Sequence, residues 1–468
     1  VASATTGVTQ SAGDNSTKLA TTAYAQTAAA NAASGVGSGL VFAIALGQVI
    51  GSGVLVLIGI GIGFTAYAVP FAIILSAIFS IIKQLPVVFM GSAMPATGGL
   101  YVYCKRVLGP KVGFFFLSLL LVTHILIALF ALGFAEYAIA LLPQLNAKYV
   151  GLGILFTFYT VNLLGIHQAA AIQKVMIALL LFGLSSLIFF GILEVDYSNF
   201  TDQEKLFPDG WYGFGMACVL MSFATGGAYY VSELGGEMKN PHHDLPRAII
   251  YSTLLAAFFI ATVSIVAVGV LPIEQTAGKT LAEVARVILP PSLYTAFIVG
   301  AALFAFATSI NSTFSWATKS VIIACEDGWL PKGLAAVNKR FNTPHILLTI
   351  LLIVGSIPIL AGKDMPYIIM LGSGLVFIYD IIPLLAAFYF AKKLPEVFAN
   401  AQIKMSEKTV KTISVIGILI LLVQANLAFS DIDNTGRLMI VAYIIFVIIY
   451  IHFRAKHQNS ITNEQNTL

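Results

Sequence analysis

Residues 47–54 read GQVIGSGV and lie in the middle of the first long apolar run of the chain. Glycine weakens a helix by roughly 1 kcal/mol per residue relative to alanine, so this cluster predicts a break in a membrane-spanning helix. A break at membrane depth is tolerated only where the freed main-chain groups line a cavity. Those N–H groups and the positive end of the next half-helix would suit a carboxylate. Close helix packing through small residues is the alternative explanation of the same glycines.

A second interruption follows in the sixth apolar run, where residues 222–241 read SFATGGAYYVSELGGEMKNP. Thr225, Gly226 and Gly227 stand in the middle of that run. Two broken helices in corresponding positions of two halves indicate the substrate site of a transporter built from inverted repeats. The halves show no direct sequence repeat, so the inversion is inferred from the interruptions alone.

The composition supports a membrane protein over its whole length. Hydrophobic residues make up 58% of the chain and charged residues 10%, against roughly 45–50% and about 25% in soluble domains. The mean hydropathy is +0.91, and the apolar runs are continuous rather than alternating, which favours helices over a barrel. We therefore predict an all-α integral membrane protein with twelve transmembrane helices. The expected spans are 39–62, 67–90, 112–141, 149–167, 170–193, 211–232, 246–271, 292–323, 345–362, 364–391, 411–430 and 434–454.

The net charge of +4 does not indicate a nucleic-acid partner, because the basic residues are scattered singly along the chain. Their excess in alternate loops predicts a multi-pass protein of the cytoplasmic (plasma) membrane with both termini in the cytoplasm. The three cysteines Cys104, Cys218 and Cys325 lie far apart without metal-ligand spacing, so we expect neither a disulfide nor a metal site.

The first 36 residues differ from the rest of the chain, since Ala, Thr, Ser, Gly, Asn and Gln dominate them. They lack the basic and apolar regions of a signal peptide. The segment GVTQSAGDNSTKLATTAYAQTAAANAA resembles parts of phage tail-fibre proteins, which points to a foreign leader. A disordered cytoplasmic tail is the alternative.

Four further stretches carry a family resemblance, and they occur in the expected order: IGSGV at 50–54, GSAMPATGGLYVY at 91–103, GGEMKNPHHDLPRAI at 235–249 and SINSTFSWATK at 309–319. The chain resembles the amino acid, polyamine and organocation (APC) superfamily from about residue 38 to 455. The resemblance implies a LeuT-like fold, a 5+5 inverted repeat in which helices 1 and 6 are broken. It divides the chain into a leader (1–36), a ten-helix transport core (37–391), helices 11 and 12 (392–456) and a cytoplasmic tail (457–468).

The resemblance also implies a substrate site between the two broken helices. Main-chain groups that would hold the substrate carboxylate belong to Ile50, Gly51, Ser52, Gly53 and Val54. Groups that would face its amino group and side chain belong to Phe223, Ala224, Thr225, Gly226 and Gly227. This chain has Thr225 where many relatives have an aromatic residue and Tyr229 where they have an acid. A strongly cationic substrate is therefore not expected.

Coupling and gating residues are predicted from charges and hydroxyls inside the spans. Lys83 and Asp380 are candidates for proton coupling, because ionisable residues in the bilayer are expensive unless they function. Thr308 and Ser309 offer hydroxyls where sodium-coupled relatives bind the ion, and Leu180 aligns with a lysine that replaces sodium in others. Glu237 and Lys239 could form ion pairs that close the inner gate. Proton symport, sodium symport and exchange all remain open.

These observations together predict a secondary active transporter that moves amino acids, chiefly neutral zwitterionic ones, by alternating access through the lipid bilayer. A sensor or scaffold of the same fold, or an amine or polyamine carrier, are the alternatives. An enzyme is not expected, since the chain has no paired intramembrane acids, HExxH helix or Ser/His constellation. The expected partners are a small amino acid or amine and a coupling H⁺ or Na⁺, without a cofactor.

Overall fold

The structure is a computed structural model of the 468-residue chain, and it describes residues 35–52, 55, 57–338, 340–362, 365–430 and 432–466. The expected leader therefore lies outside the described residues except for its last two positions. Gly53 and Val54 of the first glycine cluster also lie outside them. The predicted tail at 457–468 begins inside the last helix, which continues to Asn466.

Helices account for all the regular structure in the described part of the chain, which contains isolated β-bridges but no strand. The longer helices are α2 (Ser38–Ser52), α3 (Ile58–Thr65), α4 (Val69–Ala93), α5 (Gly99–Leu108), α6 (Pro110–Thr123), α7 (Ile127–Leu141), α8 (Ala147–Leu163), α9 (Ile166–Gly191), α11 (Gly210–Thr225), α12 (Pro241–Val270), α16 (Phe304–Trp316), α17 (Lys319–Glu326), α18 (His345–Leu360), α19 (Met365–Tyr379), α20 (Ile381–Lys393), α22 (Glu407–Ser430) and α23 (Asn434–Asn466). Shorter connecting elements include η2 (Ala66–Ala68), η3 (His124–Leu126), α10 (Gln203–Leu206), η5 (Ala228–Glu233), η6 (Gly235–Glu237), α13 (Ile273–Thr276), α14 (Ala282–Ile288), α15 (Pro291–Phe297), the π-helix η7 (Ile298–Leu303) and α21 (Pro395–Ala399).

Nine of the described helical segments are long and apolar enough to cross a membrane, and two further apolar helices, Ser38–Gly51 and His345–Leu360, are shorter. The protein is thus a multi-pass membrane protein. Several of the expected spans consist of more than one helical element. Span 364–391 is divided at Asp380 into α19 and α20, and span 292–323 is divided into α15, η7, α16 and the start of α17.

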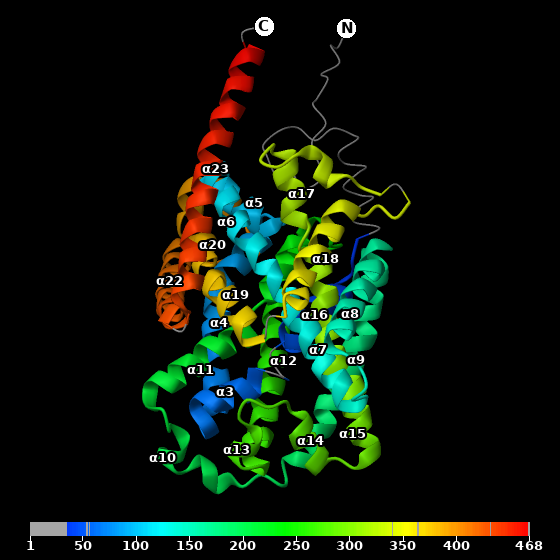
Figure 1. Ribbon diagram of the computed structural model, residues 1–468. Helices are drawn as coiled ribbons and strands as arrows, with labels where there is room; N and C mark the ends of the chain where they lie inside the picture. Colours follow the sequence, from blue (N-terminus) through cyan, green and yellow to red (C-terminus); the bar gives the residue numbers. More distant parts are fainter. Residues whose placement is uncertain are drawn as a thin grey trace.

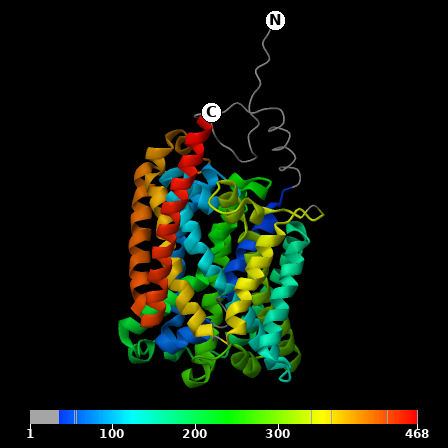
Figure 2. The ribbon, with the colours of Figure 1, turned by 45° about the horizontal axis from the view of Figure 1, so that its top comes forward.

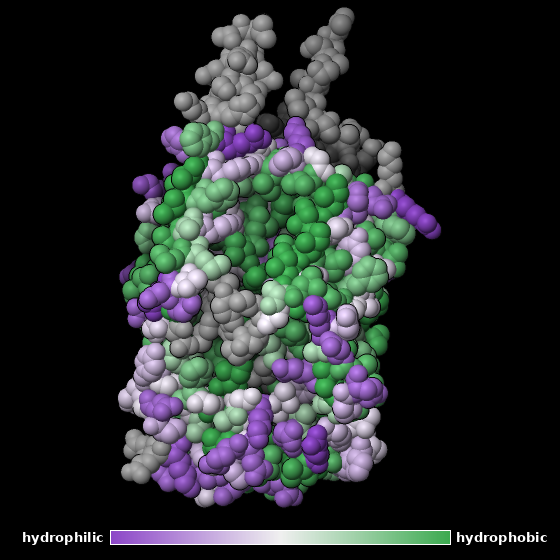
Figure 3. Space-filling view, in the orientation of Figure 1, coloured by the Kyte–Doolittle hydropathy of each residue, from purple (hydrophilic) through white to green (hydrophobic). Residues whose placement is uncertain are grey.

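The long helices form a bundle whose two ends carry different short elements (Figure 1). Helices α10, α13 and α14 lie at one end, and α5, α17 and the end of α23 lie at the other. Turning the view keeps α22 and α23 together at one edge of the bundle (Figure 2). Hydrophobic residues cover much of the flank of the bundle, and hydrophilic residues gather at its two ends (Figure 3). This distribution fits a lipid belt around the bundle.

Both ends of the described chain lie at the α17 end of the bundle. The Val36 amide donates to the Glu237 carbonyl at 2.7 Å, which fixes the start of the chain beside η6. Near the other end, the Tyr450 hydroxyl donates to the Trp329 carbonyl at 2.6 Å, and Arg454 donates to the Gly328 carbonyl at 2.9 Å. An even number of crossings connects two termini on the same side.

Helix α2 lies at the centre, where it packs against α16, α12 and α9. Packing inside lipid gains little from hydrophobicity, so small residues that allow close approach stabilise it. A side chain at Gly47 would overlap Gln173 of α9, and one at Gly51 would overlap the carbonyl oxygen of Ala305 in α16. Both glycines therefore allow the close approach of α2 to its neighbours.

Candidate substrate site

The apolar run of the sixth expected span is interrupted at the predicted glycines. Helix α11 ends at Thr225, Gly226 is extended with φ −87° and ψ −175°, and Gly227 has φ +94°, a conformation that side chains with a Cβ rarely adopt. The chain then continues as the 3₁₀-helix η5. Because the α-helical ladder stops here, main-chain groups next to Gly226 and Gly227 are released toward a pocket that both glycines line.

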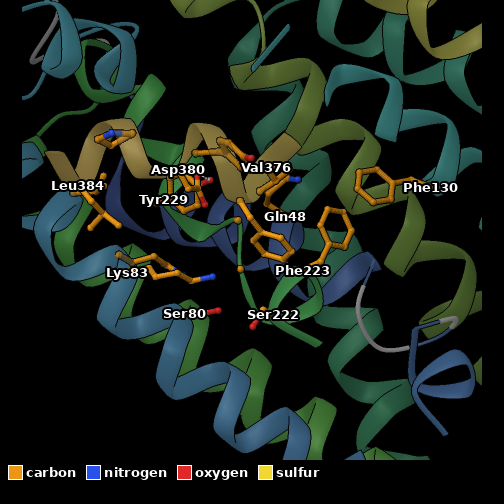
Figure 4. A pocket seen from close by; sticks show the side chains of 17 residues that line it. Gln48, Ser80, Lys83, Phe130, Ser222, Phe223, Tyr229, Val376, Asp380 and Leu384 are labelled. Carbon is orange, nitrogen blue, oxygen red and sulfur yellow. Dashed lines mark hydrogen bonds between the residues drawn. The ribbon is translucent and has the colours of Figure 1, made fainter. Parts of the chain in front are cut away.

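That pocket lies between α2, α4, α7, α11, η5 and the α19–α20 junction (Figure 4). The cavity itself has a volume of about 60 Å³. Its polar lining consists of Gln48, Ser80, Lys83, Gln84, Ser222, Tyr229, Tyr230 and Asp380. Its other lining residues are Val87, Phe130, Phe223, Gly226, Gly227, Val376, Phe377, Pro383 and Leu384. A mostly apolar cavity with a few convergent polar groups is the usual form of a small-molecule site.

The structure brings together two charged residues that the sequence singles out separately. Lys83 from α4 and Asp380 from the α19–α20 junction both line the pocket. Lys83 Nζ donates to Gln424 Oε1 of α22 at 2.9 Å, and the Tyr229 hydroxyl donates to Asp380 Oδ1 at 2.6 Å. An acid thus lies beside Tyr229, although it comes from another segment of the chain.

Asp380 is positioned by a proline three residues later. Pro383 has no amide hydrogen to give to the carbonyl four residues earlier, so the helix loses a hydrogen bond here, which favours a kink or a break. Helix α19 accordingly ends at Tyr379 and α20 begins at Ile381. The interruption places a carboxylate at the wall of the pocket.

The other predicted substrate residues lie apart from this pocket or outside the described chain. Thr225 is fully buried and donates to the Met221 carbonyl at 2.9 Å, and it is not among the described lining residues. Ala224 and Ile50 are buried in the core. Helix α2 contributes Gln48 to the lining, whereas Gly51 is not among the described lining residues.

Gln48 is a site residue that sequence reasoning missed. Its Oε1 accepts from Trp316 Nε1 at 2.9 Å and from the Thr313 hydroxyl at 3.3 Å. The Trp316 ring stacks on Tyr230 with centroids 4.3 Å apart. Gln48 could have been recognised as a candidate site residue because it is a polar residue directly after Gly47 in an apolar run. Ser80, Gln84 and Ser222 were missed as well, although polar residues spaced along one helix face could have indicated them.

The predicted sodium-binding hydroxyls are engaged by the protein itself. Ser309 donates to the Gly47 carbonyl at 3.0 Å, and Thr308 donates to the Ala305 carbonyl at 2.7 Å. The α9 side chain that reaches this region is the fully buried Gln173, and not Leu180. Gln173 Nε2 donates to the Ser312 hydroxyl at 2.9 Å and lies 3.2–3.3 Å from the carbonyls of Thr308 and Ala43.

The expected ion pairs of the loop after the sixth span form with different partners. Glu237 pairs with Lys319 at the start of α17 at 2.5 Å, whereas Lys239 is exposed and does not form the expected pair. The fully buried Glu233 accepts from the Leu100 amide at 3.1 Å and from the Ser320 hydroxyl at 2.5 Å. These contacts fasten η5 and η6 to α5 and α17.

A second ion pair strengthens the same end of the bundle. Lys105 Nζ lies 2.8 Å from Asp327 Oδ2, which also accepts from the Tyr101 hydroxyl at 2.5 Å. Burial, together with the hydrogen bond to Asp327, raises the pKa of Tyr101 above its usual value, so the hydroxyl stays a donor at neutral pH. These contacts join α5, α17 and the segment after α11 at this end of the bundle.

Comparison with known proteins agrees with this geometry. A family model described as amino acid permease matches residues 40–450. The chain is 25% identical to the branched-chain amino acid permease BcaP of Bacillus subtilis over 65% of this chain and 69% of that permease. It is 27% identical to the serine/threonine exchanger SteT of B. subtilis over 66% and 73%. It is 25% identical to the large neutral amino acids transporter small subunit 2 of Mus musculus over 64% and 60%. Because the family model covers most of the chain, the protein belongs to the amino acid permeases of the APC superfamily and is a transporter rather than an enzyme.

Proposed function

We propose that the protein is a secondary transporter that moves amino acids across the cytoplasmic membrane by alternating access. The observation that carries this proposal is the pocket at the interruption of α11, where Gly226, Gly227 and the charged side chains Lys83 and Asp380 meet. The relatives named above are a branched-chain permease, a serine/threonine exchanger and a large neutral amino acid transporter. Their names support an amino acid, and a neutral one in particular, as the substrate.

The fold that goes with this proposal has twelve membrane crossings arranged as a LeuT-like 5+5 inverted repeat, with both termini in the cytoplasm. The glycines at the end of α11 support a break in the sixth crossing, and we extend the same arrangement to the glycine cluster of the first. In this arrangement the amides of residues 50–54 hold the substrate carboxylate, and the carbonyls of residues 223–227 accept from its ammonium group.

The α17 end of the bundle is the cytoplasmic end in this proposal. It carries Lys105, Lys319 and Arg454, in agreement with the excess of basic residues expected on that side. The Glu237–Lys319 and Lys105–Asp327 pairs then close the inner gate, and opening toward the cytoplasm requires their separation.

Transport independent of sodium fits the contacts between α2 and α16. The hydroxyls of Thr308 and Ser309 already donate to main-chain carbonyls, and the amide of Gln173 supplies a donor to the oxygens around it. Because the Gln173 side chain is part of the protein, its amide can serve as hydrogen-bond donor to these oxygens without a bound sodium ion. Exchange or proton symport through Lys83 and Asp380 are the coupling modes that remain.

Counterflow in proteoliposomes tests the function directly. Vesicles loaded with one unlabelled neutral amino acid should accumulate the labelled form of it, equally well in sodium and in choline buffer. Gly226→Ala should reduce this counterflow at least ten-fold, because its Cβ would lie 2.8 Å from the Ser222 carbonyl and shift the site. Gly153→Ala is the control, since its Cβ meets open space.

The alternatives predict different results in the same experiment. A sensor or scaffold would bind an amino acid without any counterflow, and an amine carrier would exchange amines but not amino acids. Counterflow that depends strictly on sodium would disprove the sodium-independent mode.

A further inference from the structure

One face of α4 carries the polar wall of the pocket. Ser80, Lys83, Gln84 and Val87 are spaced three and four residues apart, so they lie on the same side of the helix, and all four line the pocket. Ser80 and Gln84 are almost fully buried and Lys83 is half-buried. The polar groups therefore point into the cavity from inside the bundle rather than toward lipid.

Lys83 is a cation that faces Asp380 across the pocket without forming an ion pair with it. An ammonium group has three N–H donors, and the hydrogen bond to Gln424 Oε1 uses one of them. Among the described residues, its Nζ has no carboxylate within 4.0 Å, and it lies 5.4 Å from the centroid of the Phe377 ring. A charge inside a membrane bundle is expensive unless it is closely paired, so a carboxylate that entered the pocket would give Lys83 the direct partner that Asp380 does not provide.

Gln84 provides an independent sign of the same need. Its Oε1 accepts from the Thr253 hydroxyl at 3.3 Å, but its buried Nε2 has no hydrogen-bond partner in the described structure. A buried donor left without an acceptor costs about 1–3 kcal/mol. Two adjacent side chains on one helix thus hold unused N–H donors at the same wall of the pocket.

The opposite wall carries the complementary charge. Figure 4 shows Asp380 and Tyr229 on one side of the space, and Lys83, Ser80 and Ser222 on the other. Asp380 accepts one hydrogen bond from Tyr229 and keeps acceptor capacity on its carboxylate. The cavity therefore presents donors on one side and an acceptor on the other, which suits a solute with a carboxylate and an ammonium group.

We propose that Lys83 and Gln84 form a carboxylate seat for the transported amino acid, and that Asp380 faces the ammonium group across the pocket. This inference rests on the proposed transport function and adds side chains of α4 to the main-chain groups assigned above. An amino acid offers two sources of carboxylate. If residues 50–54 hold the main-chain carboxylate, the seat takes a carboxylate on the substrate side chain; otherwise it takes the main-chain group itself.

The test measures ligand binding to the purified full-length protein by isothermal titration, with three probes. L-Alanine has only the main-chain carboxylate, L-glutamate has both carboxylates, and L-alaninamide has none. The wild type should bind alanine or glutamate and bind alaninamide at least ten-fold more weakly than alanine. Lys83→Gln should lose at least ten-fold in affinity for the ligand whose carboxylate occupies the seat. Lys148→Gln, an exposed lysine of α8, controls for the loss of one positive charge and should bind as the wild type does.

Gln84→Glu is the second variant, and it does not depend on removing the buried cation. A glutamate at 84 places a carboxylate beside Lys83, so the seat is filled by the protein itself. Affinity for the amino acid should fall at least ten-fold, while the temperature of thermal unfolding should not fall. If Lys83→Gln does not fold, Gln84→Glu decides the question.

The outcomes separate the seat from the transport function. Equal loss for alanine and glutamate in Lys83→Gln assigns the main-chain carboxylate to the seat, and loss for glutamate alone assigns the side-chain carboxylate. Wild-type affinity for both ligands in Gln84→Glu and in a folded Lys83→Gln overturns the seat and leaves transport standing. A wild type that neither binds nor exchanges any amino acid overturns both proposals.

Discussion

Replacement of Gln173 by leucine should destabilise the centre of the bundle without changing its volume much. Gln173 is fully buried between α2, α9 and α16. Its Nε2 donates to Ser312 at 2.9 Å, and its Oε1 accepts from Asn311 Nδ2 at 2.8 Å. Leucine fills most of the same space but can make neither bond.

The size of the effect follows from these two bonds and from the group that is left behind. Each short hydrogen bond contributes about 1 kcal/mol net, and the Asn311 N–H left without its acceptor adds about 1–3 kcal/mol. The longer contacts of Gln173 Nε2 to the Thr308 and Ala43 carbonyls add little, because those distances are 3.2 and 3.3 Å. Hydrogen bonds between membrane helices fall at the lower end of such values. We therefore expect a loss of about 2–4 kcal/mol in the free energy of unfolding.

The measurement is a denaturant titration of the purified protein in one detergent, compared with Gln168→Leu. Gln168 lies on the same helix α9 but is exposed, so its replacement should change the free energy of unfolding by less than about 0.5 kcal/mol. If Gln173→Leu were as stable as the wild type, the hydrogen-bonded junction would not hold these helices together. Equal losses in both variants would show that leucine on α9 is harmful for another reason.

Two further results are expected at the helix contacts and at the inner seal. Gly51→Ala should lower the free energy of unfolding by about 1–3 kcal/mol, because its Cβ would overlap the main chain of α16. Gly63→Ala is the control and should be neutral or slightly stabilising, because its Cβ meets open space. Equal unfolding curves for the two variants would refute the close contact. Glu237→Gln removes the ion pair with Lys319, worth about 1 kcal/mol, and should speed maleimide labelling of the buried Cys325 in α17 about five-fold in inside-out vesicles. Lys239→Gln is the control and should leave the labelling rate unchanged, because Lys239 is exposed. Unchanged labelling in Glu237→Gln would show that the ion pair does not hold α17 closed.

The interruption of α11 could be predicted from sequence because its cause is local. Gly226 is extended and Gly227 is left-handed. Glycine adopts the left-handed conformation at little cost because it has no Cβ. The glycines of the first run were ambiguous, since the same residue type serves both broken helices and close packing. The structure shows that Gly47 and Gly51 face neighbouring helices, and only three-dimensional contacts could reveal that.

The partners of the charged residues could not be predicted, because they come from distant parts of the chain. Glu237 was expected to form an ion pair, but its partner Lys319, which follows α16, could not be named from the sequence. Gln173 of α9, which bonds to α16, was not singled out at all. Sequence spacing fixes which side of a helix a residue occupies, but helix packing fixes what that side meets.

The same distinction explains why Lys83 and Asp380 could be recognised separately but not as members of one pocket. Each is a charge within an apolar run, and the expense of such a charge in lipid is a reason to expect a function for it. Their meeting depends on the break before Pro383, where Asp380 reaches the pocket wall, and on the packing of α4 against α11. A polar residue next to such a charge on the same helix can then line the same pocket. Gln84 looks unremarkable in the sequence, yet it shares a face with Lys83 and leaves a donor unused, so the two residues should respond together when a carboxylate enters.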